Sequence, residues 1–323
     1  MCCDGTDLVS IDELLRFTAH DDQLADVATF RRDDGTGSGS RVMHVAPAGG
    51  IHARLLLDRG MDLGRAWFAG QPISWTAAPG PRSRGYADDD QGWHLGWEGG
   101  LVTTCGLQNV GSPADGHGQH GRFTENPAER VTVSGGAGDG RLVVTGVVHE
   151  NNGIGRLLRV DRTWTFHLGS GLVELEDVTR NESPRAVQAP VLYHVNVGYP
   201  FLGPASEVAT RGDGDAVVST MGEPEDAADD VVELDVDADD EGWAAATVTS
   251  PRLGMSATIR WLSATLPRVH RWRRRAPGAY VMAIEPANCG VGGAAHDRAQ
   301  GCAPILEPGT DRTTRLSIQL EQT

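Results

Sequence analysis

A histidine and an asparagine stand two positions apart in the segment 191–202, which is rich in valine and tyrosine. That content is typical of a β-strand, and side chains two positions apart in a strand point to the same face. His194 and Asn196 therefore share one face, where they could line a polar cleft. Imidazole exchanges protons near neutral pH, so this pattern offers acid–base chemistry. The alternative is a half-exposed surface strand without a chemical role.

Aromatic and histidine side chains gather again between residues 92 and 121. Trp93 and Trp97 stand close to glycines, which suits either a flat platform for a ligand ring or a corner of the core. His117 and His120 have an HxxH spacing, but no second pair or carboxylate fixes a metal geometry. We therefore expect no metal and no other cofactor.

The overall composition narrows the class of partner. The 323 residues carry a net charge of -16, with a pI of about 5.0 and a mean hydropathy of -0.30. This acidity argues against nucleic acid and against an anionic membrane surface, and no apolar run is long enough to span a bilayer. The five cysteines lack the regular spacing of a disulfide framework. Since the N-terminus does not read as a signal peptide, we expect a cytoplasmic protein, with its oligomeric state left open.

Many short β-branched segments separated by glycine and proline predict an all-β chain. A short helix is expected at residues 11–17, and no βαβ unit is apparent. The fold class that follows is a large sandwich of two antiparallel sheets with few short helices. The segments that we predict as strands are 41–45, 51–57, 65–67, 131–133, 141–149, 157–167, 172–181, 191–202, 244–249, 255–261, 280–285 and 314–319.

Three charged segments interrupt this pattern. Residues 58–64 are either a solvated turn or the edge of a pocket. Residues 222–240 are strongly acidic, which indicates an insertion or a surface loop. Residues 271–275 form the only basic cluster, and such runs are usually solvated faces.

Seven short motifs follow one another along the chain: Arg59-Gly60-Met61-Asp62, Thr104-Cys105-Gly106-Leu107, His120-Gly121-Arg122, Tyr193-His194-Val195-Asn196, Leu266-Pro267 with Trp272, Ile284-Glu285-Pro286-Ala287-Asn288 and Leu306-Glu307-Pro308-Gly309. Taken in this order, they resemble the galactose mutarotase-like (aldose 1-epimerase-like) superfamily, and in particular a bacterial branch carried as a domain of unknown function. The resemblance covers residues 41–320 and implies a single β-supersandwich domain over 1–323 with a sugar cleft on one sheet.

The resemblance implies a catalytic set for interconverting sugar anomers. Glu285 matches the base that takes the proton from the C1 hydroxyl, and His194 matches the acid that protonates the ring oxygen. His120 matches a further active-site histidine beside that oxygen. The residue types suit these roles, because histidine titrates near neutral pH and burial can raise the pKa of a glutamate toward neutral pH.

Five further residues are candidates for binding the sugar. Forked donors and carboxylates suit vicinal hydroxyls, and an indole suits the apolar face of a pyranose. Structural salt bridges explain two of them, Arg59 and Asp62, nearly as well. The candidates are Arg59, Asp62, Arg122, Asn196 and Trp272.

Other functions stay open because the segment 193–198 departs from the corresponding string of well-studied mutarotases. The partner is expected to be a small sugar, an aldose or a ketose. A relative could epimerise or isomerise a sugar at another carbon with the same acid–base pair, or it could bind carbohydrate without catalysis.

Overall fold

The computed structural model describes residues 16–83, 92–212, 215–226 and 228–323. The helices are α2 (Gly92–Gly96), α3 (Ala294–Ala299) and the short 3-10 turns η1 (Asp21–Gln23), η2 (Gly35–Gly37), η3 (Phe123–Glu125) and η4 (Ala137–Asp139). The strands are β1 (Ala25–Arg31), β2 (Arg41–Pro47), β3 (His52–Leu56), β4 (Asp62–Phe68), β5 (Gln71–Pro72), β6 (Trp75–Thr76), β7 (Gly99–Gly100), β8 (Val102–Gly106), β9 (Ala128–Gly136), β10 (Arg141–Asn151), β11 (Leu157–His167), β12 (Leu172–Asn181), β13 (Val187–Gln188), β14 (Val191–Gly198), β15 (Glu207–Gly212), β16 (Asp215–Thr220), β17 (Asp230–Leu234), β18 (Trp243–Ser250), β19 (Met255–Leu262), β20 (Arg268–Ala276), β21 (Ala279–Ala287), β22 (Ile305–Leu306) and β23 (Asp311–Gln322).

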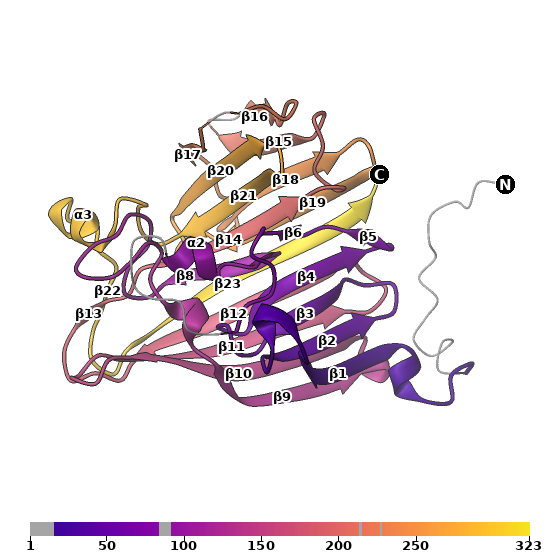
Figure 1. The fold of residues 1–323 in the computed structure, drawn as a ribbon, viewed down its shortest axis with the longest axis horizontal. Coiled ribbons are helices and arrows are strands. Elements are labelled where there is room, and N and C mark those ends of the chain that lie inside the picture. The colour runs from indigo at the N-terminus through magenta and orange to yellow at the C-terminus, as the bar shows by residue number, and fades with distance from the viewer. Residues whose placement is uncertain (1–15, 84–91, 213–214, 227) are drawn as a thin grey trace.

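Two large antiparallel sheets are stacked face to face with their strands in similar directions (Figure 1). One sheet has the order β1-β2-β3-β4-β8-β14-β21-β20-β17, with β5 beside β4. The other has the order β16-β15-β18-β19-β23-β12-β11-β10-β9. The all-β sandwich predicted from the sequence is confirmed.

The alternation of apolar and polar residues explains how the sheets pack. In β11 every second side chain is buried, so one face of this strand meets the core and the other faces outward. The buried face includes Trp164, which packs in the same core as Val195 of the opposite sheet. Burial of such apolar surface is the main term that stabilises the sandwich.

The strand β14 lies in the middle of the ten-stranded sheet and is buried along its whole length. Tyr193, Val195 and Val197 face the core between the sheets. His194 and Asn196 therefore point to the opposite face of the sheet, as the period of two predicts. The half-exposed surface strand considered as an alternative is excluded, since His194 is 4% exposed and Asn196 is 0% exposed.

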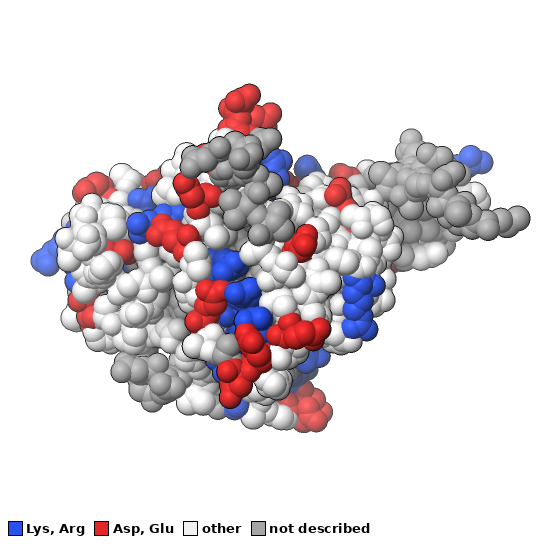
Figure 2. Space-filling model, turned by 90° about the horizontal axis from the view of Figure 1, so that it is seen from above, with Lys and Arg blue, Asp and Glu red and all other residues white. Residues whose placement is uncertain are grey.

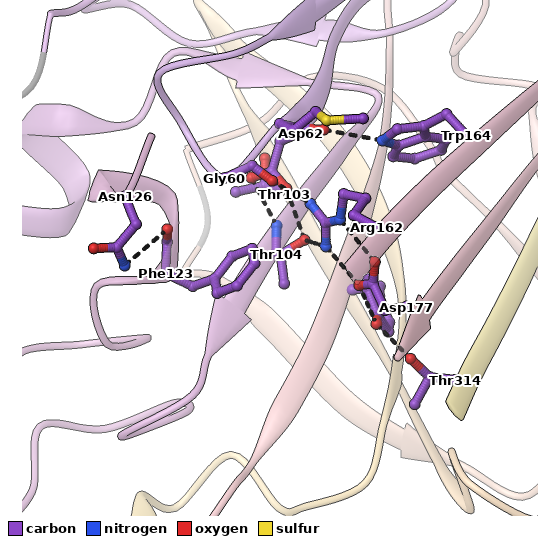
Figure 3. A network of polar contacts seen from close by, with 12 residues as sticks. Gly60, Asp62, Thr103, Thr104, Phe123, Asn126, Arg162, Trp164, Asp177 and Thr314 are labelled. Atoms are coloured by element: carbon purple, nitrogen blue, oxygen red, sulfur yellow. Dashed lines mark hydrogen bonds and ion pairs between the residues drawn. The ribbon is translucent and has the colours of Figure 1, made fainter. Parts of the chain in front are cut away.

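A buried guanidinium joins the two sheets through all five of its N–H groups (Figure 3). Arg162 of β11 donates to both carboxylate oxygens of Asp177 at 2.8 and 2.7 Å. It also donates across the core to the Gly60 carbonyl, to Asp62 and to the Thr104 hydroxyl at 2.7, 2.7 and 2.8 Å. The segment 58–64 is thus neither a solvated turn nor a pocket edge, because Arg59 to Gly64 are buried against this network.

The acidic segment 222–240 is also more than a surface loop, because Asp230 to Leu234 form β17, an edge strand paired with β20. Its charge complements the basic cluster: Asp230 accepts hydrogen bonds from Arg271 and Arg273, each at 2.7 Å. Asp229 likewise accepts one from Arg274 at 2.6 Å. Seen from above, basic side chains lie between acidic ones on this face (Figure 2).

Most other predicted elements match observed ones, and β11 and β12 have the predicted bounds. The strand predicted over 191–202 ends at Gly198, where a turn begins. Residues 11–15 of the helix predicted over 11–17 lie outside the described part of the chain, and Arg16 and Phe17 form a turn. None of the described helices has the length and apolar character needed to cross a membrane.

Candidate active site

Polar side chains line up in a row across five strands of the ten-stranded sheet. Residues paired in register point to the same face of a sheet, so the row forms one continuous polar band. From β8 through β14, β21 and β20 to β17, the row consists of Thr103, His194, Glu285, His270 and Glu233.

The centre of this row is a buried histidine–glutamate pair. Nε2 of His194 lies 3.0 Å from Oε1 of Glu285, and the two side chains are 5% and 4% exposed. On the other side of the ring, Nδ1 of His194 lies 2.5 Å from Oδ1 of Asn196. The Asn196 amide donates both of its hydrogens, to the carbonyls of Gly100 and His194. Its Oδ1 must therefore accept, so Nδ1 of His194 carries a hydrogen and donates it.

This tautomer decides what lies between His194 and Glu285. A neutral ring with hydrogen on Nδ1 presents the lone pair of Nε2 to the carboxyl group, and a lone pair cannot bond to a carboxylate oxygen. A proton must bridge the two atoms, on either the glutamate or the imidazole. Burial raises the pKa of Glu285 to about 8. Burial lowers the pKa of His194 to about 4, against a raising effect of the hydrogen bond to Asn196. Between those limits the pair holds one proton and has no net charge.

A second histidine faces this pair as a neutral hydrogen-bond donor. Nδ1 of His120 accepts a hydrogen bond from the Gly111 amide at 3.3 Å. Burial, followed by the neighbouring His194 and His94, lowers the pKa of His120 to about 3, so the ring is neutral with its hydrogen on Nε2. Its backbone has φ of 59°, a left-handed conformation that is uncommon outside glycine and that occurs at functional sites.

These groups lie in a cavity of about 390 Å³ with walls from α2, the loop 111–120 and strands β14, β17, β20 and β21. Three tryptophans line it. The rings of Trp97 and Trp272 lie 5.1 and 5.3 Å from the His194 ring, and that of Trp93 lies 4.6 Å from His120. The volume is in the usual range for a small-ligand site, and indole faces suit the C–H face of a sugar. Both alternatives for Trp93 and Trp97 are met in part: the two side chains line the cavity, and Trp97 is also a core residue, 6% exposed, whose indole N–H donates to Thr103 at 3.0 Å.

Four of the predicted site residues line the same cavity, although the chain separates them widely: His120, His194, Trp272 and Glu285. Asn196 lies behind His194 and orients its ring. The other predicted binding residues are elsewhere. Asp62 belongs to the buried Arg162 network, where Thr104 also donates to it.

The remaining two predicted residues also do not line the cavity. Arg59 is 5% exposed and pairs with Glu125 at 3.2 Å. Arg122 is half-buried, and its backbone amide donates to Gln108 at 3.2 Å. For Arg59 and Asp62 the salt-bridge alternative is thus the observed one.

Several lining residues were missed by sequence reasoning. Asp229 and Val231 come from the acidic segment, whose charge hid the short strand β17. His94 follows Trp93 on α2, a helix too short to give a periodic signal. His270 does not line this cavity but lies beside Glu285 in the polar row; it stands two positions before Trp272 in β20, and that spacing alone could have placed both on one face.

Comparison with known proteins agrees with this fold. A profile of the DUF4432 family, a domain of unknown function, matches residues 37–320, and no functionally curated protein matches the sequence. A solved structure of a candidate aldose 1-epimerase from Klebsiella pneumoniae subsp. pneumoniae is 22% identical with a TM-score of 0.83, over 91% of this chain and 83% of that one.

Two other solved structures share the fold at lower identity. A galactose mutarotase-like protein from Clostridium acetobutylicum is 12% identical with a TM-score of 0.61, over 93% of this chain and 100% of that one. A galactose 1-epimerase from Lactobacillus acidophilus is 9% identical with a TM-score of 0.62, over 92% and 99%. The resemblance seen in the ordered motifs is confirmed at the level of fold. The chain belongs to the DUF4432 family, and its fold is the galactose mutarotase-like β-sandwich.

Proposed function

We propose that this protein is an aldose 1-epimerase-like isomerase that interconverts the anomers of a sugar, with Glu285 as base and His194 as acid. The observation that carries the proposal is the pair itself, a carboxyl group and an imidazole 3.0 Å apart on the floor of an aromatic cavity. Fold neighbours named as epimerases and mutarotases support the same class.

The spacing of the pair suits the geometry of an anomeric centre. The C1 hydroxyl and the ring oxygen are both bonded to C1, so a base and an acid in mutual contact can reach both at once. Glu285 takes the hydroxyl proton while His194 gives a proton to the ring oxygen, and the C1–O bond of the ring opens. Rotation of the free aldehyde followed by the reverse transfers gives the other anomer. Each such proton transfer typically contributes about 10²–10⁴-fold to the rate.

One arrangement of the shared proton matches the proposed roles. With the proton on Nε2 of His194, the histidine is the acid and Glu285 is the base; with the proton on Glu285, the two roles are exchanged. Both arrangements have the same charge, so a bound sugar needs only to favour the ionised one. The Nε2 hydrogen of His120 can also bond the ring oxygen as the ring opens. The reaction consists of proton transfers, so the proposal calls for no metal.

Proton NMR of aldoses and ketoses with and without the protein tests the proposal. Accelerated exchange between anomer signals, lost in Glu285→Gln, is the expected result. A new sugar would indicate epimerisation or isomerisation at another carbon, and line broadening without exchange would indicate a binding protein. Activity that a chelator removes and a divalent ion restores would also count against the proposed mechanism.

A further inference from the structure

A second hollow of about 620 Å³ continues the cavity along the same face of the sheet. Val231 and Val291 line both spaces, so the two are neighbours and these side chains lie at their common border. The row of polar side chains also runs from one to the other: Glu285 lines the first space, and the second is lined by its cross-strand neighbour His270 and by Glu233, which pairs with His270. A ligand that is bound at Glu285 and extends beyond the first cavity would therefore enter the hollow beside His270.

Two deeply buried side chains at this hollow each have one polar atom without a hydrogen-bond partner among the described residues. His270 is 2% exposed and Asp297 of α3 is 1% exposed. Oδ1 of Asp297 accepts from the Gly290 amide at 3.2 Å. Oδ2 of Asp297 and Nδ1 of His270 have no hydrogen-bond partner among the described residues. A buried polar atom left unpaired costs about 1–3 kcal/mol, so stability of the fold alone does not explain them.

The charges of the hollow limit the ligand that it can hold. Arg268 is engaged by Glu233, with Nε 3.0 Å from Oε1, and Nε2 of His270 lies 4.0 Å from the same carboxylate. Asp297 adds a second carboxylate, so acidic side chains exceed the single guanidinium. This excess of negative charge disfavours a phosphate or other anion as the ligand. No tryptophan is among the residues that line this hollow, in contrast to the first cavity. Hydroxyl groups, which donate and accept, match such a lining.

We propose that the second hollow is a subsite for a further, uncharged sugar ring, so that the preferred substrate is a reducing disaccharide or longer oligosaccharide. Its reducing ring would occupy the tryptophan-lined cavity at His194 and Glu285, and the next ring would donate a hydroxyl to Asp297. The catalytic test of this inference rests on the proposed function. A direct measurement of disaccharide binding tests the inference independently of that function.

The test compares each monosaccharide with disaccharides that end in it. Glucose is compared with maltose, cellobiose and melibiose, and galactose with 4-galactobiose, by the kcat/KM of anomer exchange in NMR. We expect at least one disaccharide to exceed its monosaccharide about tenfold, the value of one or two additional hydrogen bonds. Gln300 also lines the second hollow, with an exposed side chain. Asp297→Asn and Gln300→Ala should each lower the ratio of disaccharide to monosaccharide kcat/KM, Asp297→Asn about tenfold. Gln322→Ala, at a distant surface, is the control.

The outcomes separate this inference from the proposed function. Anomer exchange on monosaccharides with no gain for any disaccharide, and ratios unchanged in both variants, would overturn the subsite and leave the proposed function standing. If no sugar is turned over, saturation-transfer NMR decides: disaccharide binding weakened by Asp297→Asn supports the subsite, and absence of binding overturns it. Tighter binding of glucose 6-phosphate than of any disaccharide would overturn the uncharged class.

Discussion

At the scale of single residues, the proton shared by His194 and Glu285 is the centre of the proposed chemistry. Glu285→Gln keeps the shape and a donor to Nε2 but removes the base, and His194→Gln removes the titrating ring. Each change should lower kcat by about 10²–10⁴-fold with little effect on sugar affinity, because the lost interaction is made in the transition state. Saturation kinetics check this. The double variant should be little slower than the single ones, since the two groups act together.

A matched control for these variants is Glu174→Gln, because Glu174 pairs with His167 at 2.7 Å on the outer surface of the other sheet. It has the same chemical change and should keep full activity. Near-normal kcat in folded Glu285→Gln would show that the base is another group.

The pH dependence of kcat/KM should be bell-shaped. The pair gains a second proton below about pH 4, where His194 titrates, and loses its only proton above about pH 8, where Glu285 titrates. The acid limb therefore reflects His194, while the carboxyl group of Glu285 produces the alkaline limb. Initial rates across this range test both limbs. A rate that keeps rising above pH 8 would contradict the one-proton pair.

The same pKa shift predicts a stability effect. The folded pKa of Glu285, about 8, lies above its ordinary value of 4.5, so the folded state holds a proton that the unfolded state has lost in this interval. Stability from this group is complete below pH 4.5 and is lost as the pH rises through 8. Glu285→Gln does not titrate, so its Tm should rise relative to that of the natural protein between pH 5 and pH 8. A Tm difference that is constant with pH would contradict the shift.

At the scale of elements, the edge strand β17 depends on charge pairing for its place beside β20. Asp230 binds both Arg271 and Arg273, so Asp230→Asn removes two ion pairs at once. Amide hydrogen exchange in β17 should then rise about tenfold. Because Asp229 and Val231 line the cavity, KM should also rise while kcat stays constant.

The control for the edge strand is Glu176→Gln, which removes an ion pair with Arg315 at 2.7 Å between β12 and β23. Exchange in β17 should be unaffected by it. Equal protection of β17 in Asp230→Asn and the natural protein would show that the backbone ladder alone holds the strand.

At the scale of the whole molecule, the two sheets are joined by the Arg162 network as well as by apolar packing. Arg162→Met would leave Asp62 and Asp177 buried without their cation, which typically costs about 3–5 kcal/mol. Urea unfolding should show this loss. Adding Asp62→Asn and Asp177→Asn should restore part of it, because the stranded charges are then removed. A triple variant less stable than Arg162→Met would contradict this account.

The sequence by itself determined the sandwich and the identity of the central pair. The period of two in 157–167 and 172–181 is a local property, and it placed those strands with their observed bounds; the same period put His194 and Asn196 on one face. The ordered motifs pointed to His120, His194, Trp272 and Glu285, which meet in the cavity. Only the tertiary structure decided that Asp62 forms an ion pair with Arg162 across the core, that the acidic segment contains the strand β17, and that His270 pairs with Glu285 on the neighbouring strand. Those facts depend on which strands become neighbours, and the pairing of strands distant in sequence is set by the packing of the whole chain rather than by any local pattern.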